Sequence, residues 1–502
     1  MSAPHATLTF PEGHSVKSLE FPVGCFINNE FSASEGGRTI EVFAPAYDKV
    51  IARVAEATEK DVDRAVDAAE KAFKTTWGTH CAPSERGRLL MKLADLFEEH
   101  REQLASIEAL DNGKAYSFAC GDVDMAAACF RFYGGAADKS DGRTIEVDES
   151  KMAYTRHEPI GVVGQIIPWN FPLMMLSWKL GPALAAGCTI ILKTAETTPL
   201  SAFYACTLIA KLFPPGVVNV LTGYGHIVGQ AISSHMRIMK VAFTGSTLVG
   251  RQIMKAAASS NLKPVTLELG GKSPNIVFED ADLDEAASWG SFGLFFNAGQ
   301  CCAAGSRIFV QESVYNAFLE KLTANVKALK FGDSFAADTF AGPLTSKQQY
   351  DRVTAHIKSG KDEGATVHLG GNRIGSEGFF IEPTVFTDVE PNMRIAQEEI
   401  FGPVLVVQRF KDEEELIAKA NDSIYGLAAA VFSKDISRCF RVAHALQAGT
   451  VWVNCYNVLS LQVPYGGWKQ SGFGKELSTD AISNYTAVKA IHVNLSARAP
   501  KF

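Results

Sequence analysis

Short apolar runs alternate with helical stretches through the middle of this 502-residue chain, and this alternation constrains the fold more than any other feature. Apolar runs lie at residues 161–168, 188–193, 217–221 and 239–243, and helical segments follow the last three. This order indicates βαβ units, whose parallel strands are covered by helices on both faces. A nucleotide binds such a sheet at the carboxyl ends of its strands.

The alternation starts again beyond Gly270 and Gly271, where paired glycines suit a bend between two domains. Asp280 or Asp282 caps a helix that leads toward residue 302. The sequence therefore predicts a second α/β domain, with strands at 275–278 and 307–310 and a helix at 313–329.

Two amphipathic helices are predicted ahead of the first sheet. Val62, Val66, Ala69 and Phe73 recur at helical spacing over residues 60–73. Ser84 is the predicted N-cap of the second helix, whose apolar face holds Leu89, Leu90, Leu93 and Phe97.

The composition excludes several classes of partner. The chain has a net charge of -7 and no run of Lys or Arg, so we expect neither a nucleic acid nor an anionic membrane as partner. The sequence has no run of about 18 apolar residues, the length that a helix needs to span a bilayer. The ten cysteines include no C-x-x-C pair, so no metal is expected. Because residues 1–20 lack the features of a presequence, we expect a reduced, cytoplasmic protein.

Cys301 and Cys302 are adjacent and lie among small residues just after an apolar helical run. A thiolate attacks a carbonyl carbon readily, and small neighbours leave room for a substrate to approach. Free cysteines are also among the most buried residues, so a pair of inert core thiols is the alternative interpretation. The segments upstream decide between the two.

Two segments have the character of a nucleotide site. The small-residue turn at 245–250 follows a strand and starts a helix, where backbone N–H groups can bind phosphate. It matches neither G-x-G-x-x-G nor a P-loop, and an ordinary βα turn is the alternative. Lys193 and Glu196 end another strand, and the acid suits ribose hydroxyls but repels a 2′-phosphate. A solvated ion pair is the alternative there.

Two further segments hold polar groups in stiff or apolar surroundings. Glu268 lies between leucines beside a glycine pair, and apolar surroundings raise the pKa of a carboxyl toward that of a general base. Asn170 lies between Trp169 and Phe171, where a rigid amide suits an oxyanion hole. A strand residue that faces water and a turn asparagine are the alternatives.

The joint order of these segments resembles the aldehyde dehydrogenase superfamily, from about residue 26 to about residue 493. The most specific matches are residues 267–274 and 299–302, backed by 168–172 and 398–403. The resemblance is closest to the NAD-dependent class with broad substrates, which includes cytosolic and mitochondrial members.

The resemblance implies three catalytic residues. Cys302 would attack the aldehyde carbon, and the Asn170 amide and the Cys302 backbone N–H would hold the oxyanion. Hydride would then pass from the thiohemiacetal to NAD. Glu268 would activate the water that hydrolyses the resulting thioester to a carboxylic acid. Cys301 would have no catalytic duty.

An NAD site is implied in the same way. Lys193 and Glu196 would bind the adenosine ribose, Ser246 the pyrophosphate, and Glu399 the nicotinamide ribose beside Phe401. The implied cofactor-binding residues are Ile166, Pro168, Trp169, Lys193, Glu196, Gly229, Phe243, Gly245, Ser246, Gly250, Leu269, Glu399 and Phe401.

A small aldehyde would enter through an apolar tunnel. Leu459 and Tyr465 replace phenylalanines of some relatives, and Asn457 leaves room for a hydroxylated substrate. Lys179 and Glu476 match positions that pass protons to the general base. The implied tunnel residues are Phe171, Met175, Trp178, Phe296, Asn457, Leu459 and Tyr465.

The implied fold class is α/β, with a Rossmann-like cofactor domain, an α/β catalytic domain and a small β oligomerisation extension. The expected limits are 1–140 and 160–270 for the NAD-binding domain, 271–472 for the catalytic domain, and 141–159 with 473–502 for the extension and C-terminal tail. Strands at 143–147 and 487–493 would pair across subunits in a homotetramer, a dimer of dimers.

Three other interpretations stay open. A CoA-acylating relative would resolve the thioester with CoA, although such relatives generally lack the base at Glu268. A catalytically inactive structural relative would keep the fold without the activity. A thioester-forming hydrolase would cleave esters and reduce no NAD.

Overall fold

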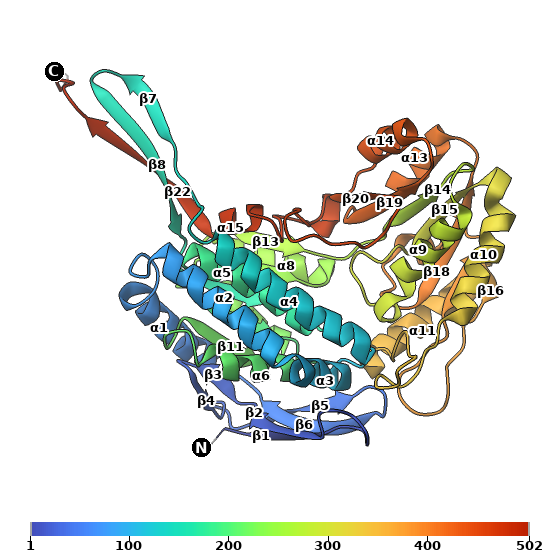
Figure 1. The fold of residues 1–502 in the computed structure, drawn as a ribbon, viewed down its shortest axis with the longest axis horizontal. Helices are drawn as coiled ribbons and strands as arrows, with labels where there is room; N and C mark the ends of the chain where they lie inside the picture. The colour runs from blue at the N-terminus through green and yellow to red at the C-terminus, as the bar shows by residue number, and fades with distance from the viewer. Residues whose placement is uncertain (1–2, 500–502) are drawn as a thin grey trace.

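Two twisted sheets form the two main bodies of the computed structural model, which describes residues 3–499 (Figure 1). The first sheet has eight strands and the second has seven. In spatial order the first sheet runs β21 (Gly472–Phe473), β13 (Val265–Glu268), β12 (Lys240–Thr244), β9 (Val162–Ile166), β10 (Thr189–Thr194), β11 (Val218–Thr222), β3 (Cys25–Ile27) and β4 (Glu30–Ser32).

Five consecutive strands of this sheet, from β13 to β11, are parallel, and they are apolar because helices cover both faces. Ile190 and Leu192 of β10 pack into one core cluster, whereas Ile191 points into the other. One face carries α1 (Glu59–Thr75), α7 (Gln230–Ser234) and α8 (Thr247–Ser259). The other carries α5 (Pro172–Ala186) and α6 (Leu200–Ile209), overlaid by α2 (Pro83–Glu99), α3 (Arg101–Asp111) and α4 (Tyr116–Ala136).

The second sheet lies in the other body and is parallel apart from one edge pair. Its spatial order is β16 (Thr366–Leu369), β17 (Thr384–Thr387), β18 (Val404–Phe410), β15 (Arg307–Gln311), β14 (Pro274–Val277), β19 (Ala428–Phe432) and β20 (Thr450–Val453). Its helices are α9 (Leu283–Phe295), α10 (Tyr315–Ala328), α11 (Lys347–Asp362), α12 (Arg394–Gln397), α13 (Glu413–Asn421) and α14 (Ile436–Ala445).

A three-stranded antiparallel sheet projects away from both bodies (Figure 1). Its central strand β8 (Lys151–Pro159) pairs with β7 (Thr144–Asp148) and, along nine residue pairs, with β22 (Thr486–Asn494). The short helix α15 (Asp480–Ser483) leads into β22. Near the N-terminus, β1 (His5–Thr9) pairs with β2 (Ser18–Pro22), and β5 (Thr39–Ala44) pairs with β6 (Lys49–Ala55).

The predicted α/β fold class is confirmed, and each strand predicted between residues 161 and 310 is present within one or two residues. The chain leaves the first sheet after β13, passes Gly270 and Gly271, and enters the second sheet at β14. Asp282 is the N-cap of α9, as predicted. The prediction for Ser84 was wrong, because α2 begins at Pro83 after Ala82, and Pro suits the first helical position since it needs no N–H partner.

Candidate functional site

A cavity of about 370 Å³ opens where β9, β10, β12 and β13 end, and the second body closes its far side. Side chains that the sequence separates by more than 200 residues meet there, as expected at the carboxyl edge of a parallel sheet. Of the predicted site residues it is lined by Ile166, Pro168, Trp169, Asn170, Lys193, Glu196, Phe243, Gly245, Ser246, Glu268, Cys302, Glu399 and Phe401.

Cys302 reaches this cavity because the chain turns sharply just before it. Asn297, Ala298 and Gly299 all have positive φ, between 51° and 73°, so a tight left-handed turn follows α9. A Cβ at Gly299 would overlap the carbonyl of Gly402, so only glycine fits. The turn leaves Cys302 half-buried on the cavity, while Cys301 is 7% exposed and packs in the core.

The groups around Cys302 keep its thiol protonated. Its hydrogen bond with Cys301 and its burial raise the pKa of the Cys302 thiol well above the ordinary value, and contacts with Tyr465 and Glu268 lower it. A neutral thiol needs a base to become a nucleophile. The adjacent carboxyl is the group placed to take that proton.

Glu268 ends β13, and its side chain is only 2% exposed. Both carboxyl oxygens are buried, and neither has a hydrogen-bond partner. Burial, followed by the charge of Cys302, raises the pKa of Glu268 well above the ordinary value. A buried carboxyl without partners is costly to a fold, so its position in a cavity beside a thiol marks a functional group.

Asn170 lies in the loop between β9 and α5, and neighbouring asparagines fix this loop. Asn297 Nδ2 donates to the Asn170 carbonyl at 3.1 Å, and Asn112 Nδ2 donates to the Trp169 carbonyl at 2.7 Å. Asn170 Nδ2 donates to the Gln300 carbonyl at 3.0 Å, which ties it to the segment before Cys302. One of its two amide protons is thereby used, and the other stays available to an oxyanion.

Lys179 and Glu476 form a buried ion pair behind Glu268. Lys179 Nζ also donates to Thr244 Oγ1 at 2.9 Å. Charges on both members of the pair affect the pKa of Glu268, that of Lys179 lowering it and that of Glu476 raising it. The pair is therefore electrostatically linked to the general base that the sequence predicts.

The opposite side of the cavity has the groups that a dinucleotide needs. Lys193 is buried, and its Nζ donates to the Thr194 carbonyl at 2.9 Å and lies 3.3 Å from Glu196 Oε2. Ser246 caps α8, whose N-terminus faces the cavity, and a helix N-terminus favours phosphate. Thr197 Oγ1 is buried on the wall without a partner, which leaves a hydrogen bond for a ligand hydroxyl.

Glu399 is held close to the glycine pair on the wall of the second body. Its Oε1 accepts from Gly271 N at 3.1 Å, and a Cβ at Gly270 would overlap its carboxyl. Burial raises the pKa of Glu399 to about 7. Phe401 lies beside it with a positive φ of 61°, its ring 5.2 Å from that of Trp169. These residues fit a ribose and a flat ring between the two bodies.

Three predicted cofactor residues lie behind the cavity wall instead of on it. A Cβ at Gly250 would lie 2.9 Å from Leu269, so these two residues pack against each other under α8. Gly229 is buried near Ile166 and Lys193. The sequence prediction missed Gln349 and Arg352 on the cavity, because α11 has the polar and apolar pattern of any surface helix.

Four of the seven predicted tunnel residues are aromatic, and these four form two ring pairs. Phe171 stacks on Phe296 at 5.8 Å, and Trp178 contacts Tyr465 edge-on at 5.5 Å. Tyr465 Oη is 3.3 Å from Cys302 Sγ. Met175 is buried beside them, whereas Leu459 and Asn457 are half-buried.

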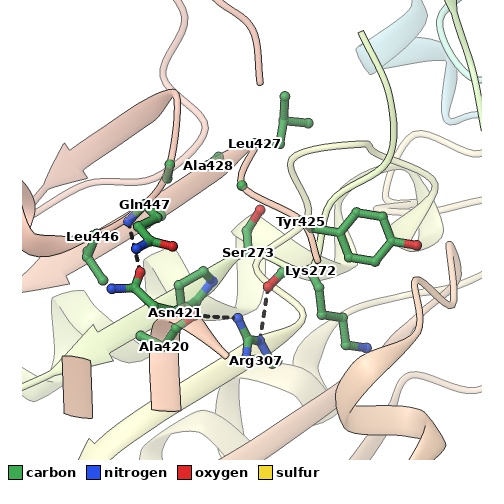
Figure 2. Close-up of a pocket in the computed structure, with 14 residues that line it drawn as sticks. Lys272, Ser273, Arg307, Ala420, Asn421, Tyr425, Leu427, Ala428, Leu446 and Gln447 are labelled. Carbon is green, nitrogen blue, oxygen red and sulfur yellow. Dashed lines mark hydrogen bonds between the residues drawn. The ribbon is translucent and has the colours of Figure 1, made fainter. Parts of the chain in front are cut away.

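A second, much smaller cavity lies where β14, β15, α13 and β19 meet, and its polar groups serve the fold (Figure 2). The Arg307 guanidinium donates to the carbonyls of Lys272, Lys419 and Ala420 at 2.9–3.3 Å. Figure 2 draws the bonds to Lys272 and Ala420. Asn421 Oδ1 accepts from Gln447 N at 2.8 Å. Within residues 3–499, no group of three or more His, Cys, Asp or Glu is arranged to hold a metal ion, and no helix is long and apolar enough to cross a membrane.

The fold and the main cavity define an α/β enzyme with a thiol, an unpaired carboxyl and a dinucleotide cradle. Residues 31–491 match the aldehyde dehydrogenase family, and the chain therefore belongs to this family. The family prediction is confirmed.

Relatives and solved structures agree over nearly the whole chain. An aldehyde dehydrogenase of Aspergillus niger is 58% identical over 99% of both chains, and a mitochondrial aldehyde dehydrogenase of Rattus norvegicus is 52% identical over 94% of this chain and 91% of its own. The NAD+ complex of aldehyde dehydrogenase from Bacillus cereus superimposes with a TM-score of 0.93 at 51% identity, covering 94% of this chain and 97% of that one.

Proposed function

We propose that this protein oxidises small aldehydes to carboxylic acids with NAD, through a thioester on Cys302 that water resolves. The observation that carries the proposal is the position of an unpaired buried carboxyl, Glu268, beside a cysteine in the cavity that Lys193, Glu196 and Ser246 also line. A base, a nucleophile and a dinucleotide cradle in one cavity are the parts that this reaction needs.

The first half of the reaction forms the covalent bond. Glu268 takes the thiol proton, and the Cys302 sulfur attacks the aldehyde carbon to give a tetrahedral thiohemiacetal. The Asn170 amide and the Cys302 backbone N–H hold the oxygen that gains negative charge. NAD accepts the hydride that leaves this carbon, and a thioester remains on the sulfur.

The second half releases the acid. Glu268 takes a proton from water, the hydroxide attacks the thioester carbon, and the Cys302 sulfur leaves. The Lys179–Glu476 pair is the route by which the proton leaves Glu268. Because Glu268 is the base for water, the proposal favours hydrolysis over transfer to CoA.

The preference for NAD over NADP follows from Glu196. Its carboxyl lies at the end of β10, where a second phosphate on the adenosine ribose would meet a negative charge. Lys193 partly offsets that repulsion, because its Nζ lies 3.3 Å from the Glu196 carboxyl.

We also propose a homotetramer, a dimer of dimers, that works in the cytoplasm. Ile145, Val147, Met152 and Val488 are exposed on the projecting sheet of β7, β8 and β22, and exposed strands of this kind are normally covered. The strands of this projecting sheet belong to the expected extension, residues 141–159 and 473–502. The expected NAD-binding domain covers 1–140 and 160–270, and the expected catalytic domain covers 271–472. The ten cysteines, all within the described residues, form no disulfide, which suits a reducing compartment.

The chemical proposal is tested with Cys302→Ala and its matched neighbour Cys301→Ala. NADH formation from a panel of aldehydes should vanish in the first variant and stay largely intact in the second, because only one sulfur faces the cavity. Equal losses would mean that the wrong sulfur is assigned. Acyl-CoA formation that requires added CoA would favour an acylating enzyme, and ester cleavage without NADH formation would favour a hydrolase.

A further inference from the structure

Tyr465 places a hydroxyl beside the nucleophile. Its Oη lies 3.3 Å from Cys302 Sγ, within hydrogen-bond distance for sulfur. The side chain is 3% exposed, and its ring lies edge-on against Trp178 at 5.5 Å. A buried phenol normally has a hydrogen-bond partner, and here that partner is the reactive sulfur.

The backbone holds this hydroxyl in place without a substrate. Tyr465 N donates to the Glu476 carbonyl at 2.8 Å, and Glu476 N donates back to the Tyr465 carbonyl at 2.7 Å. The two bonds form a β-bridge, and Glu476 is itself fixed by its ion pair with Lys179. The phenol is therefore preorganised, so little entropy is lost when it acts.

The direction of the hydrogen bond follows from the charges around it. Burial, and then the charges of Cys302 and Glu268, raise the pKa of Tyr465 well above the ordinary value. The phenol therefore keeps its proton and donates to the sulfur once the thiol has ionised. Among the described residues, no Lys, Arg or His side chain donates to this sulfur. The titratable groups that act on the pair are Cys301, Glu268 and Tyr456, and Lys179 and Glu476 act in turn on Glu268.

We propose that the Tyr465 hydroxyl is a catalytic group: it donates a hydrogen bond to the Cys302 thiolate and holds the sulfur in its attacking position. This inference rests on the proposed function and adds to it. The tunnel needs only an aromatic ring at position 465, which phenylalanine supplies equally well. The hydroxyl gives this chain a donor to the nucleophile that phenylalanine at this position lacks.

The test compares Tyr465→Phe with the wild type, using iodoacetamide to alkylate the enzyme in the absence of aldehyde and NAD. Cys302→Ala identifies the signal that belongs to the nucleophile. The rate against pH should shift to higher pH in Tyr465→Phe, with alkylation near neutral pH slower by about tenfold, the range of one hydrogen bond to a charged group. The kcat/KM for a small aldehyde should fall in parallel, while KM for NAD stays unchanged.

Tyr456→Phe is the matched control. Tyr456 is also fully buried, and its hydroxyl bonds to the Ala303 carbonyl, so the variant loses a hydroxyl from the same region without touching the sulfur. Its alkylation profile should stay at the wild-type pH. An unshifted profile for Tyr465→Phe, or a shift as large for Tyr456→Phe, overturns the proposal. Because alkylation needs no turnover, this result stands apart from any failure to oxidise aldehydes.

Discussion

Two buried ionisable side chains in this protein have opposite surroundings. Arg307 begins β15 of the second sheet and donates to three backbone carbonyls, those of Lys272, Lys419 and Ala420. Figure 2 draws the bonds to Lys272 and Ala420. Glu268 is equally buried at the end of the first sheet, yet neither of its carboxyl oxygens has a partner. The Arg307 guanidinium therefore holds segments of the chain together, whereas the Glu268 carboxyl holds none.

The difference shows which group the fold needs and which group the reaction needs. Burial lowers the pKa of Arg307 to about 10, so it stays charged at neutral pH and its bonds to the carbonyls persist. Burial raises the pKa of Glu268 well above its ordinary value, the direction that makes a carboxylate a stronger base. The unsatisfied group therefore marks the site, and the satisfied one marks the scaffold.

The largest expected effect is on turnover in Glu268→Gln. This variant keeps the shape of the side chain but cannot take a proton from water, so steady-state turnover should fall by about 10²–10⁴-fold, the usual contribution of a general base. Glu268 also takes the thiol proton before hydride transfer, so the burst of NADH in stopped-flow absorbance should slow as well, but by less than steady-state turnover. A burst slowed as much as turnover would contradict the role of Glu268 as the base for water in the second half of the reaction.

Arg307→Met should have the next largest effect, on stability and not on chemistry. Three carbonyls would lose their donor in a dry interior, so unfolding should become easier by roughly 3 kcal/mol. Thermal unfolding measures this directly, and the activity per folded molecule should stay close to that of the wild type.

Arg441→Met is the matched control for Arg307→Met. Arg441 pairs with Glu413 at the surface, and such pairs contribute at most about 1 kcal/mol. If the two arginine variants unfold at the same temperature, the three carbonyl bonds of Arg307 are not what holds this region together.

The sequence predicted the parts of the fold whose strands are buried on both faces. The strands near Ile191, Val220 and Ala242 are continuous apolar runs, so their pattern is local and visible. The strands of residues 5–55 were missed, because they are short and several face water on one side. The antiparallel pairing of β3 with β11, and of β21 with β13, depends on contacts between distant segments that no local pattern records.

In the candidate site, too, some residues are visible in the local sequence and others depend on tertiary packing. Asn170, Glu268 and Cys302 lie in short, distinctive segments, and the structure brings all three to one cavity. Arg352 reaches that cavity from α11 in the second body, and only the packing of the two bodies puts it there. The packing of Gly250 against Leu269 also depends on tertiary structure, because either residue could equally have faced a ligand.

The smallest expected effect is on the pH dependence of stability, and it tests whether the unpaired carboxyl of Glu268 is costly to the fold. The pKa of Glu268 is raised in the folded state above its ordinary 4.5, so the folded protein binds its proton more tightly than the unfolded chain does. Glu268 therefore costs no stability below about pH 4.5, and its cost grows as pH rises through the folded pKa and then levels off.

Glu268→Gln removes this titration, so its melting temperature should gain on the wild type as pH rises. Glu413→Gln should change in the opposite direction. The bond to Arg441 lowers the pKa of Glu413, so that carboxyl adds stability above its unfolded pKa, and its variant should lose ground as pH rises. Melting temperatures of the three proteins at a series of pH values would show both slopes. Parallel slopes would mean that the unpaired carboxyl costs the fold nothing, and the contrast with Arg307 would then lose its physical basis.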